Sequence, residues 1–311
     1  QVGDMMAFIQ YAMQIIMAFL MITAMSIMLP RANVAAMRIV EILETENSLK
    51  EPEAPVHPSE EIKGTVEFDH VSFAYPDAGE NVLTDISFKA EKGQTLAVIG
   101  STGSGKSSLI NLIPRFYDVI QGCVKVDGVD VRSMSQKELR DRLGYVPQKG
   151  VLFSGTIDSN IRYGKTDISE EQVKKAAMVA QAQDFIEEKP HGYESPVAQG
   201  GTNVSGGQKQ RLSIARAVAK DPEIFIFDDS FSALDFKTDK ALRKALKEHT
   251  KNATTIIVAQ RISTILNADQ ILVLDDGKMA GLGTHRELMK NCEVYRQIAM
   301  SQLSEEELAN E

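Results

Sequence analysis

Two adjacent carboxylates follow the apolar run in the segment "IFIFDDSFSALD", which extends from Ile224 to Asp235. The four residues before Asp228 are all apolar, and such a run predicts a buried strand with Asp228 and Asp229 at its end. A carboxylate in this place can hold a divalent cation, and its neighbour can act as a general base. Asp is the shorter acid, although a base that activates a water has to reach toward it. The pair predicts a hydrolytic site with an unusual second acid.

A glycine-rich loop, "GSTGSGKSS" at residues 100–108, matches the pattern G-x-x-x-x-G-K-[ST]. It follows the apolar segment "TLAVI" and precedes the helical segment "SSLINLI". We expect Lys106 to reach the β and γ oxygens of a nucleoside triphosphate, and Ser107 and Asp228 to hold Mg²⁺. The N-terminus of the helix adds partial positive charge. The residues expected around the phosphates are Gly100, Ser101, Thr102, Gly103, Ser104, Gly105, Lys106, Ser107 and Ser108.

Alternating and continuous apolar patterns predict the elements that position these groups. Residues 64–75 alternate as a strand pair would, and "EIFIFDD" and "TTIIVAQ" are apolar throughout, as strands of a buried parallel sheet are. The segment "DQILVLDDGKMAGLG" predicts a hairpin that turns at Asp276 and Gly277. Residues 137–220 are largely helical in period. We therefore expect an α/β domain from Gly64 onward.

The N-terminal segment from Met5 to Pro30 contains no charged residue. Its 26 residues correspond to about 39 Å of helix, whereas a hydrocarbon core is about 30 Å thick. The run is too long for a signal peptide, and no basic region precedes it. Arg31 and Arg38 follow the span, so the positive-inside rule predicts that the bulk of the chain is cytoplasmic. The chain begins with Gln1, which suggests a fragment of a longer protein.

Composition narrows the classes of function. The chain has 311 residues and a net charge of −9, which argues against a nucleic-acid-coating protein but not against nucleotide binding. Cys123 and Cys292 are far apart in sequence, so we expect two reduced thiols. The predicted domains are residues 1–44 (end of a membrane domain, with an amphipathic extension after the span), 45–63 (a linker rich in proline and acids), 64–303 (a nucleotide-binding domain) and 304–311 (an acidic tail).

The segment "VSGGQKQR", Val204–Arg211, resembles the signature that separates ATP-binding-cassette (ABC) proteins from other P-loop NTPases. Further motifs follow in family order. Tyr75 resembles the aromatic residue that stacks on adenine, and Gln148 in "YVPQ" resembles the glutamine that senses Mg²⁺ and the transport domain. "SALD", which ends at Asp235, resembles the loop that crosses the dimer. The resemblance covers nearly all of residues 64–302, and "LFSGTIDSNIRYG" with the preceding span is similar to the exporter branch.

This resemblance implies an α/β fold, a P-loop NTPase cassette with a RecA-like core, an antiparallel β subdomain and an α-helical subdomain, preceded by a transmembrane α-helix. It also implies a head-to-tail dimer, in which each ATP lies between the phosphate loop of one chain and the signature of the other. The signature residues here are Ser205, Gly206, Gly207 and Gln208. A hydroxyl and N–H groups at a helix N-terminus suit a γ-phosphate.

Two residues depart from the family pattern in the hydrolytic half of the site. Asp229 stands where active members usually carry Glu, and Gln260 stands where they usually carry a switch histidine. A carboxylate withdrawn by about 1 Å can cost roughly 100-fold in rate. Glutamine can hydrogen-bond a phosphate but cannot become cationic. We therefore expect a site that binds ATP well and hydrolyses it poorly. A third departure, Gln199 where exporters often have Glu, carries less weight.

The phosphate loop and the signature, in contrast, follow the family pattern. A homodimer would have Asp229 and Gln260 in both sites, whereas in a heterodimer this signature would complete a partner's competent site. We therefore predict a heterodimeric exporter half with ATP and Mg²⁺ as ligands, a lipid bilayer around its span and no nucleic-acid partner. The cell membrane is its expected location, with the ATPase domain in the cytoplasm. The competing interpretations are a weakly hydrolysing regulatory clamp or scaffold, a soluble cassette protein and an importer. The membrane span and the lack of a basic excess argue against the soluble protein, and an importer is disfavoured because importer cassettes are normally separate chains.

The predicted span has a face of methionine residues, which does not identify the transported cargo. Met13, Met17, Met21 and Met25 recur every four residues. They suit either plain helix packing or a polarizable cavity wall for amphipathic, drug-like or lipid-like cargo. One helix of an expected six does not identify that cargo.

Overall fold

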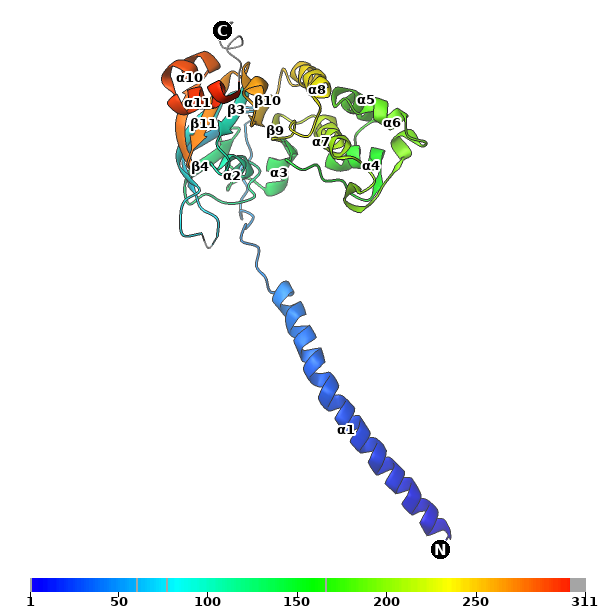
Figure 1. Cartoon of the computed structure of the whole chain (residues 1–311). Helices are drawn as coiled ribbons and strands as arrows, with labels where there is room; N and C mark the ends of the chain where they lie inside the picture. Colours follow the sequence, from blue (N-terminus) through cyan, green and yellow to red (C-terminus); the bar gives the residue numbers. More distant parts are fainter. Residues whose placement is uncertain (1, 60, 77, 166, 303–311) are drawn as a thin grey trace. The chain divides into compact units, whose positions relative to one another are not determined.

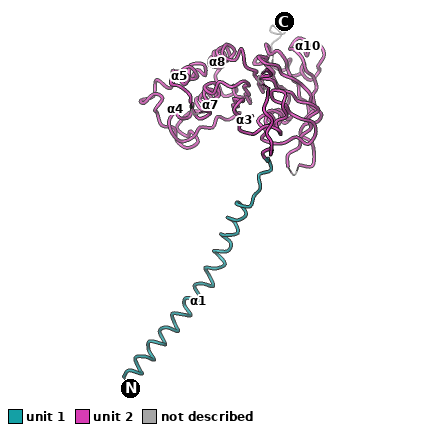
Figure 2. The backbone as a smooth tube through the Cα atoms, turned by 180° about the vertical axis from the view of Figure 1, so that it is seen from behind, with its two compact units in different colours: residues 1–50 teal, residues 51–311 magenta. Residues whose placement is uncertain are grey.

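The computed structural model describes residues 2–59, 61–76, 78–165 and 167–302. The chain divides into two compact units, which are residues 1–50 and residues 51–311 (Figure 2). Each unit is described by itself.

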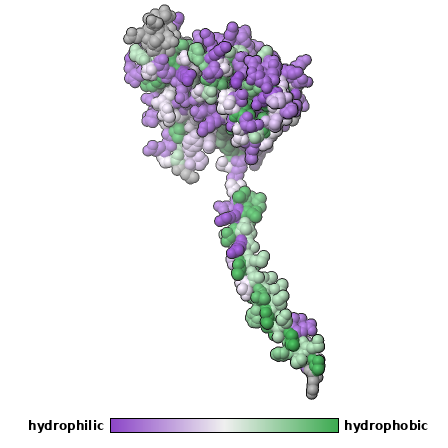
Figure 3. All heavy atoms as spheres, turned by 45° about the vertical axis from the view of Figure 1, so that its right-hand side comes forward, coloured by the Kyte–Doolittle hydropathy of each residue, from purple (hydrophilic) through white to green (hydrophobic). Residues whose placement is uncertain are grey.

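Helix α1 (Val2–Leu43) makes up most of the first unit (Figure 1). Its 42 residues span about 63 Å, and within this described helix no side chain is buried. Figure 3 shows apolar residues along most of its visible surface. It is the helix of the described chain that is long and apolar enough to cross a membrane. The helix continues through Pro30, so the predicted span and its predicted extension form one element.

The second unit contains a six-stranded sheet with the strand order β12-β11-β3-β10-β9-β6. Its five parallel strands are β3 (Thr95–Gly100), β6 (Leu143–Val146), β9 (Ile224–Asp228), β10 (Thr254–Val258) and β11 (Gln270–Asp275). Strand β12 (Lys278–Gly283) is antiparallel to β11 across a turn at Asp276 and Gly277, which both have positive φ. These observations confirm the predicted parallel strands and hairpin.

A second, antiparallel sheet has the order β2-β1-β4-β5. Its strands are β1 (Val66–Phe73), β2 (Leu83–Ala90), β4 (Gln121–Val126) and β5 (Val129–Asp130). The predicted strand pair in residues 64–75 was wrong, because this segment forms the single strand β1. The pairing of β1 shifts register between Phe68 and Val71, where His70 has φ of 49°. A bulge interrupts the apolar alternation there, and a bulge and a tight turn look alike in sequence.

Helices, strand β6 and a small two-stranded antiparallel sheet lie between β5 and β9. The helices are α3 (Gln136–Asp141), α4 (Ile157–Ile161), α5 (Glu170–Val179), α6 (Gln183–Glu187) and α7 (Gly206–Lys220). Figure 1 shows α4 to α7 grouped together, and they surround a core that includes Leu212 and Ile214. The helical prediction for residues 137–220 missed β6 and the two-residue strands β7 (Gly155–Thr156) and β8 (Pro196–Val197). Three 3₁₀ turns lie at Arg162–Gly164, Gly192–Glu194 and Gln199–Gly201.

Helices cover both faces of the six-stranded sheet. Leu96 and Val98 of β3 belong to a core shared with α2 (Lys106–Leu112) and the antiparallel sheet, whereas Ala97 and Ile99 face α10 and α11. This division follows from the two-residue side-chain period of a strand. The remaining helices are α8 (Phe236–His249), α9 (Ile262–Ile265), α10 (His285–Asn291) and α11 (Glu293–Gln302). The predicted acidic tail, residues 304–311, lies outside the described residues.

The second half of the predicted linker is attached to α3 and the turn before it. Val56 N–H donates to the carbonyl oxygen of Ser133 at 2.8 Å, and the Glu51 carboxylate accepts from Gln136 N–H at 3.1 Å. His57 Nδ1 lies 2.7 Å from Glu138 Oε2. Residues 51–58 therefore follow the surface of the second unit instead of forming a free tether.

Candidate functional site

The glycine-rich loop connects β3 to α2 through left-handed backbone conformations and close contact with neighbouring residues. Gly103 and Gly105 have φ of 85° and 94°, which L-residues with a side chain adopt at a cost. A Cβ on Gly105 would lie 2.8 Å from Leu83 Cδ2 and 3.1 Å from the carbonyl oxygen of Val82. Glycine is therefore required here both for the backbone conformation and for the close approach of β2.

Lys106 directs its ammonium group into this loop. Its Nζ donates to the carbonyl oxygens of Gly100 at 2.9 Å and Ser101 at 2.6 Å. Burial lowers the pKa of Lys106, while the charges of Asp229 and Asp228 act in the opposite direction. Phosphate oxygens could replace the two carbonyl oxygens and restore charge pairing to a partly desolvated cation.

Ser107 and Asp228 meet at the adjoining edge of the sheet. The Ser107 hydroxyl donates to Asp228 Oδ1 at 3.1 Å, and Asp228 is only 6% exposed. Burial raises the pKa of Asp228, and the Ser107 hydrogen bond opposes that shift. Among the described residues, no group of three or more His, Cys, Asp or Glu side chains is placed so that it could hold a metal ion. A hydroxyl and one carboxylate suit Mg²⁺, which commonly takes one or two protein ligands and fills its other positions with phosphate and water.

Asp229 sits in a hydrogen-bonded cluster with both glutamines that the sequence indicated. Its Oδ2 accepts from Gln260 Nε2 at 2.7 Å and from Gln148 Nε2 at 3.3 Å. Asp229 is 8% exposed and has φ of 45°, and burial raises its pKa. The three residues follow β10, β6 and β9, whose carboxyl ends share one sheet edge. The two amides donate to the same carboxylate oxygen, one of the two that a base could direct at water.

Tyr75 lies beside the first turn of α2. Its hydroxyl is 2.8 Å from Ser108 Oγ, and its half-buried ring makes edge-to-face contacts with Phe73 and Tyr117. These contacts fix the ring next to the phosphate loop. Stacking of the ring on adenine stays a prediction.

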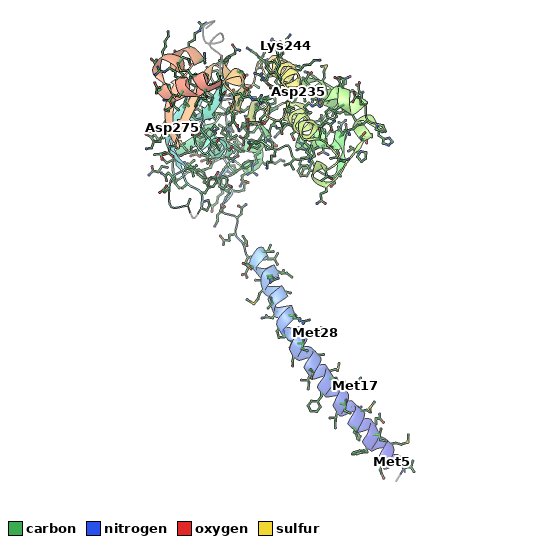
Figure 4. All side chains as sticks on the ribbon, viewed as in Figure 1. Met5, Met17, Met28, Asp235, Lys244 and Asp275 are labelled. Carbon is green, nitrogen blue, oxygen red and sulfur yellow. The ribbon has the colours of Figure 1, made fainter. Side chains whose placement is uncertain are left out.

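The signature residues and Asp235 form separate helix caps. Ser205 and Gln208 make a capping box at the start of α7, with Gln208 N–H donating to Ser205 Oγ at 3.3 Å. Asp235 begins α8 and accepts from Thr238 N–H at 3.0 Å, and this backbone contact lowers its pKa (Figure 4). Within the described parts of the chain, no hydrogen bond joins these caps to the loop at residues 100–108.

Gly206 and Gly207 differ in what surrounds them. A Cβ on Gly206 would meet nothing within 4 Å, whereas one on Gly207 would contact the carbonyl oxygen of Ala233 at 3.5 Å. The backbone of Gly206 is not in the left-handed region. The described fold of this chain therefore does not itself require glycine at position 206.

Gln302, at the end of α11, is a positioning residue that the sequence did not reveal. Its Nε2 donates to the carbonyl oxygen of Gln260 at 2.8 Å, and its Oε1 accepts from Ile262 N–H at 2.8 Å. One side chain thus forms hydrogen bonds to the backbone at two positions of the loop that carries Gln260. No local pattern marks such a contact, because the partners are 42 positions apart.

We expect Gln302→Ala to loosen this loop. Loss of the two hydrogen bonds should cost about 1 kcal/mol of local stability, or roughly a five-fold faster amide exchange in residues 259–265. Hydrogen exchange read by mass spectrometry measures this rate. Gln297→Ala is the matched control, because Gln297 lies on the same helix and bonds only to the side chain of Glu293 among described residues. Equal exchange in both variants would show that Gln302 does not hold the loop.

A family model and two related proteins match this chain over much or all of its length. A family model described as ABC transporter matches residues 83–232. An uncharacterized ABC transporter ATP-binding protein of Mycobacterium tuberculosis is 47% identical over 305 residues, which cover 97% of this chain and 52% of that protein. The human ATP-binding cassette sub-family B member 6 is 39% identical, over 100% of this chain and 37% of its own length.

A solved structure gives the same result for the fold. The structure of a bacterial Atm1-family ABC exporter with ATP bound superposes with a TM-score of 0.83 at 36% identity. The match covers 89% of this chain and 48% of that one. The chain spans about half the length, or less, of the proteins that it matches.

Proposed function

The second unit of this chain is an ABC transporter ATP-binding domain homologous to those of ABC exporter half-transporters, and we propose that the protein couples ATP binding and hydrolysis to export across a membrane. The observation that carries the proposal is the meeting of Lys106, Ser107 and Asp228 around the glycine-rich loop. Helix α1 supports a place in the membrane for the first unit. By the positive-inside argument, the ATPase domain is cytoplasmic.

ATP binding rests on groups that already converge in the described structure. The loop at residues 100–108 surrounds the phosphates, Lys106 contacts the β and γ oxygens, and Tyr75 stacks on the adenine. Ser107 and Asp228 would hold Mg²⁺, with Gln148 close to it, and the ion would neutralise charge on the transferred phosphoryl group.

We propose that ATP hydrolysis at this chain's own site is impaired. Asp229 is one methylene shorter than Glu, and its Oδ2 is engaged by the amides of Gln148 and Gln260. A general base contributes roughly 10² to 10⁴ in rate, and only when it is placed against its water. Neither glutamine can take up a proton in place of the carboxylate.

The signature of this chain then serves a partner. The Ser205–Gln208 capping box starts α7, which has 15 residues, with the Ser205 hydroxyl and the N–H groups of Gly206 and Gly207 at this end of the helix. The open space at Gly206 supports a close approach by a group from outside the chain. We infer a heterodimer in which the signature completes a competent site, with Asp235 at the dimer contact. The cargo class, an amphipathic small molecule, rests on the apolar, methionine-rich α1.

A regulatory subunit is the second candidate. The hydrogen bonds from two amides to Asp229 favour a site that holds ATP as a clamp, with little turnover. Transport that continues when neither site hydrolyses ATP would favour this alternative.

Purification of the full-length protein from its native membrane, alone and with the half-transporter that accompanies it, tests the proposal. We expect the chain alone to bind ATP and turn it over slowly, and the complex to hydrolyse ATP. For the chain alone, Lys106→Ala measures background ATPase. Rapid turnover by the chain alone would refute the impaired site, and absence of ATP binding would refute the nucleotide site.

A further inference from the structure

We propose that a cavity between α8, α9 and the strands β3, β9 and β10 binds a small amphipathic anion, a carboxylate with a short apolar body. The cavity has a volume of about 310 Å³. This is at the small end of ligand pockets, which range from roughly 300 to 1,000 Å³. The volume favours a compact ligand over a nucleotide or a full-length lipid.

The inner part of the cavity is apolar. Ala97, Phe227 and Ile257 line it from three neighbouring strands, and Leu246 and Ile265 line it from the covering helices. An apolar body placed there would lose contact with water at about 25 cal/mol per Å² of buried surface.

The outer part of the cavity is cationic. Arg243, Lys244 and Lys247 of α8 line it, and its lining includes no Asp or Glu. Arg243 is paired with Asp239 at 2.8 Å. Glu248, which lies outside the lining next to Lys247, is paired with Lys251, so the positive charge at the cavity comes mainly from Lys244 and Lys247. Lys244 and Lys247 are exposed, and neither makes an ion pair with a carboxylate in the described segments. Figure 4 labels Lys244 on α8. Charge complementarity therefore selects an anion.

Thr255 adds an unsatisfied polar group to the wall. It is 6% exposed, and its hydroxyl has no hydrogen-bond partner among the described residues. An unpaired buried hydroxyl destabilises the folded state. Rotation about χ1 exchanges the hydroxyl with the methyl group, so a carboxylate or its water could provide the missing partner.

Two residues connect this cavity with the Asp229 cluster. Phe231 and Thr264 line it, and they also line a 530 Å³ cavity that includes Asp229 and Gln260. Phe231 follows Asp229 by two positions, and Thr264 lies on α9 just after Gln260. A bound ligand would therefore contact the bases of both catalytic loops. This coupling rests on the proposed function, whereas the binding site itself does not.

Calorimetry with 4-phenylbutyrate tests the binding site on the full-length protein in zwitterionic nanodiscs, with empty nanodiscs subtracted. We expect binding at least about tenfold tighter than that of 4-phenylbutylamine, its cationic analogue. Lys244→Glu with Lys247→Glu should weaken binding about tenfold, and Ala268→Phe, which fills the cavity, should abolish it. Lys237→Glu with Lys240→Glu, the same charge change on α8 outside the lining, should change affinity less than twofold. Equal binding of the amine, equal loss in both double variants, or unchanged binding by Ala268→Phe would overturn the proposal.

A fluorescent ATP analogue separates the two claims. Saturating phenylbutyrate should change the affinity of the protein for the ATP analogue about fivefold. By reciprocity, the analogue should change the affinity for phenylbutyrate by the same factor. Phenylbutyrate binding without this change would overturn the coupling. Failure of the analogue to bind in the absence of phenylbutyrate would count against the proposed function instead.

Discussion

Replacing Asp229 by Glu and Gln260 by His should raise ATP hydrolysis at this chain's own site about 100-fold. The longer acid moves the carboxylate toward the attacking water by about 1 Å, and this reach is what Asp229 lacks. The histidine removes the 2.7 Å amide contact that holds Asp229 Oδ2 and supplies a group that can carry positive charge. Single-turnover hydrolysis by the full-length protein in nanodiscs measures the change.

The two single variants and Asp229→Asn with Gln260→His are the matched controls. Each single variant should give a smaller increase, and the asparagine variant should give none because it has no base. An unchanged rate in the Asp229→Glu, Gln260→His protein would mean that the defect lies elsewhere in the site.

The pH dependence of ATP hydrolysis at the chain's own site, with Asp229 in place, provides an independent test of Asp229 as the base. Burial raises the pKa of Asp229, so the carboxylate is protonated over a wider range of acidic pH than an exposed Asp. A base has to be ionised, so the rate should fall as pH falls through that raised pKa. Asp229→Asn should lose this acidic limb.

Gly206→Asp should reduce ATP hydrolysis by the complex with the partner by about 10² to 10³, the range seen when one charge-stabilising contact is lost. The new side chain has open space around its Cβ, and an acid in the first turn of α7 suits the helix dipole. The fold should therefore be retained, while the carboxylate repels the γ-phosphate of a nucleotide bound to the partner.

Lys106→Ala in the same complex provides the contrast. It removes the ammonium group from this chain's own phosphate loop and should leave most of the hydrolysis intact, since the competent site belongs to the partner. Steady-state ATPase of the two variants is compared with ATP-analogue binding. Loss of hydrolysis in Lys106→Ala with retention in Gly206→Asp would reverse the proposed division of labour.

Contiguous patterns predicted a large part of the fold. The loop at residues 100–108, the apolar strands and the turn at Asp276 and Gly277 each depend on residues close together in the chain, so their sequence periods and turn residues were sufficient. Strand β1 was misassigned as a strand pair because the bulge near His70 looks like a turn in the sequence. Strands β6, β7 and β8 were missed because they lie in a segment that is largely helical in period.

By itself, the sequence determined the types of chemical group available: a phosphate loop, a metal-binding acid, a short second acid and a signature. Only the tertiary structure decided that Gln148 and Gln260 donate to the same oxygen of Asp229, and that Gln302 holds the loop of Gln260 from the end of α11. The strand order β10-β9-β6 is the physical reason, because it brings together the ends of three strands that are far apart in the chain. The apolar content of each strand predicts its burial, but not which strand becomes its neighbour.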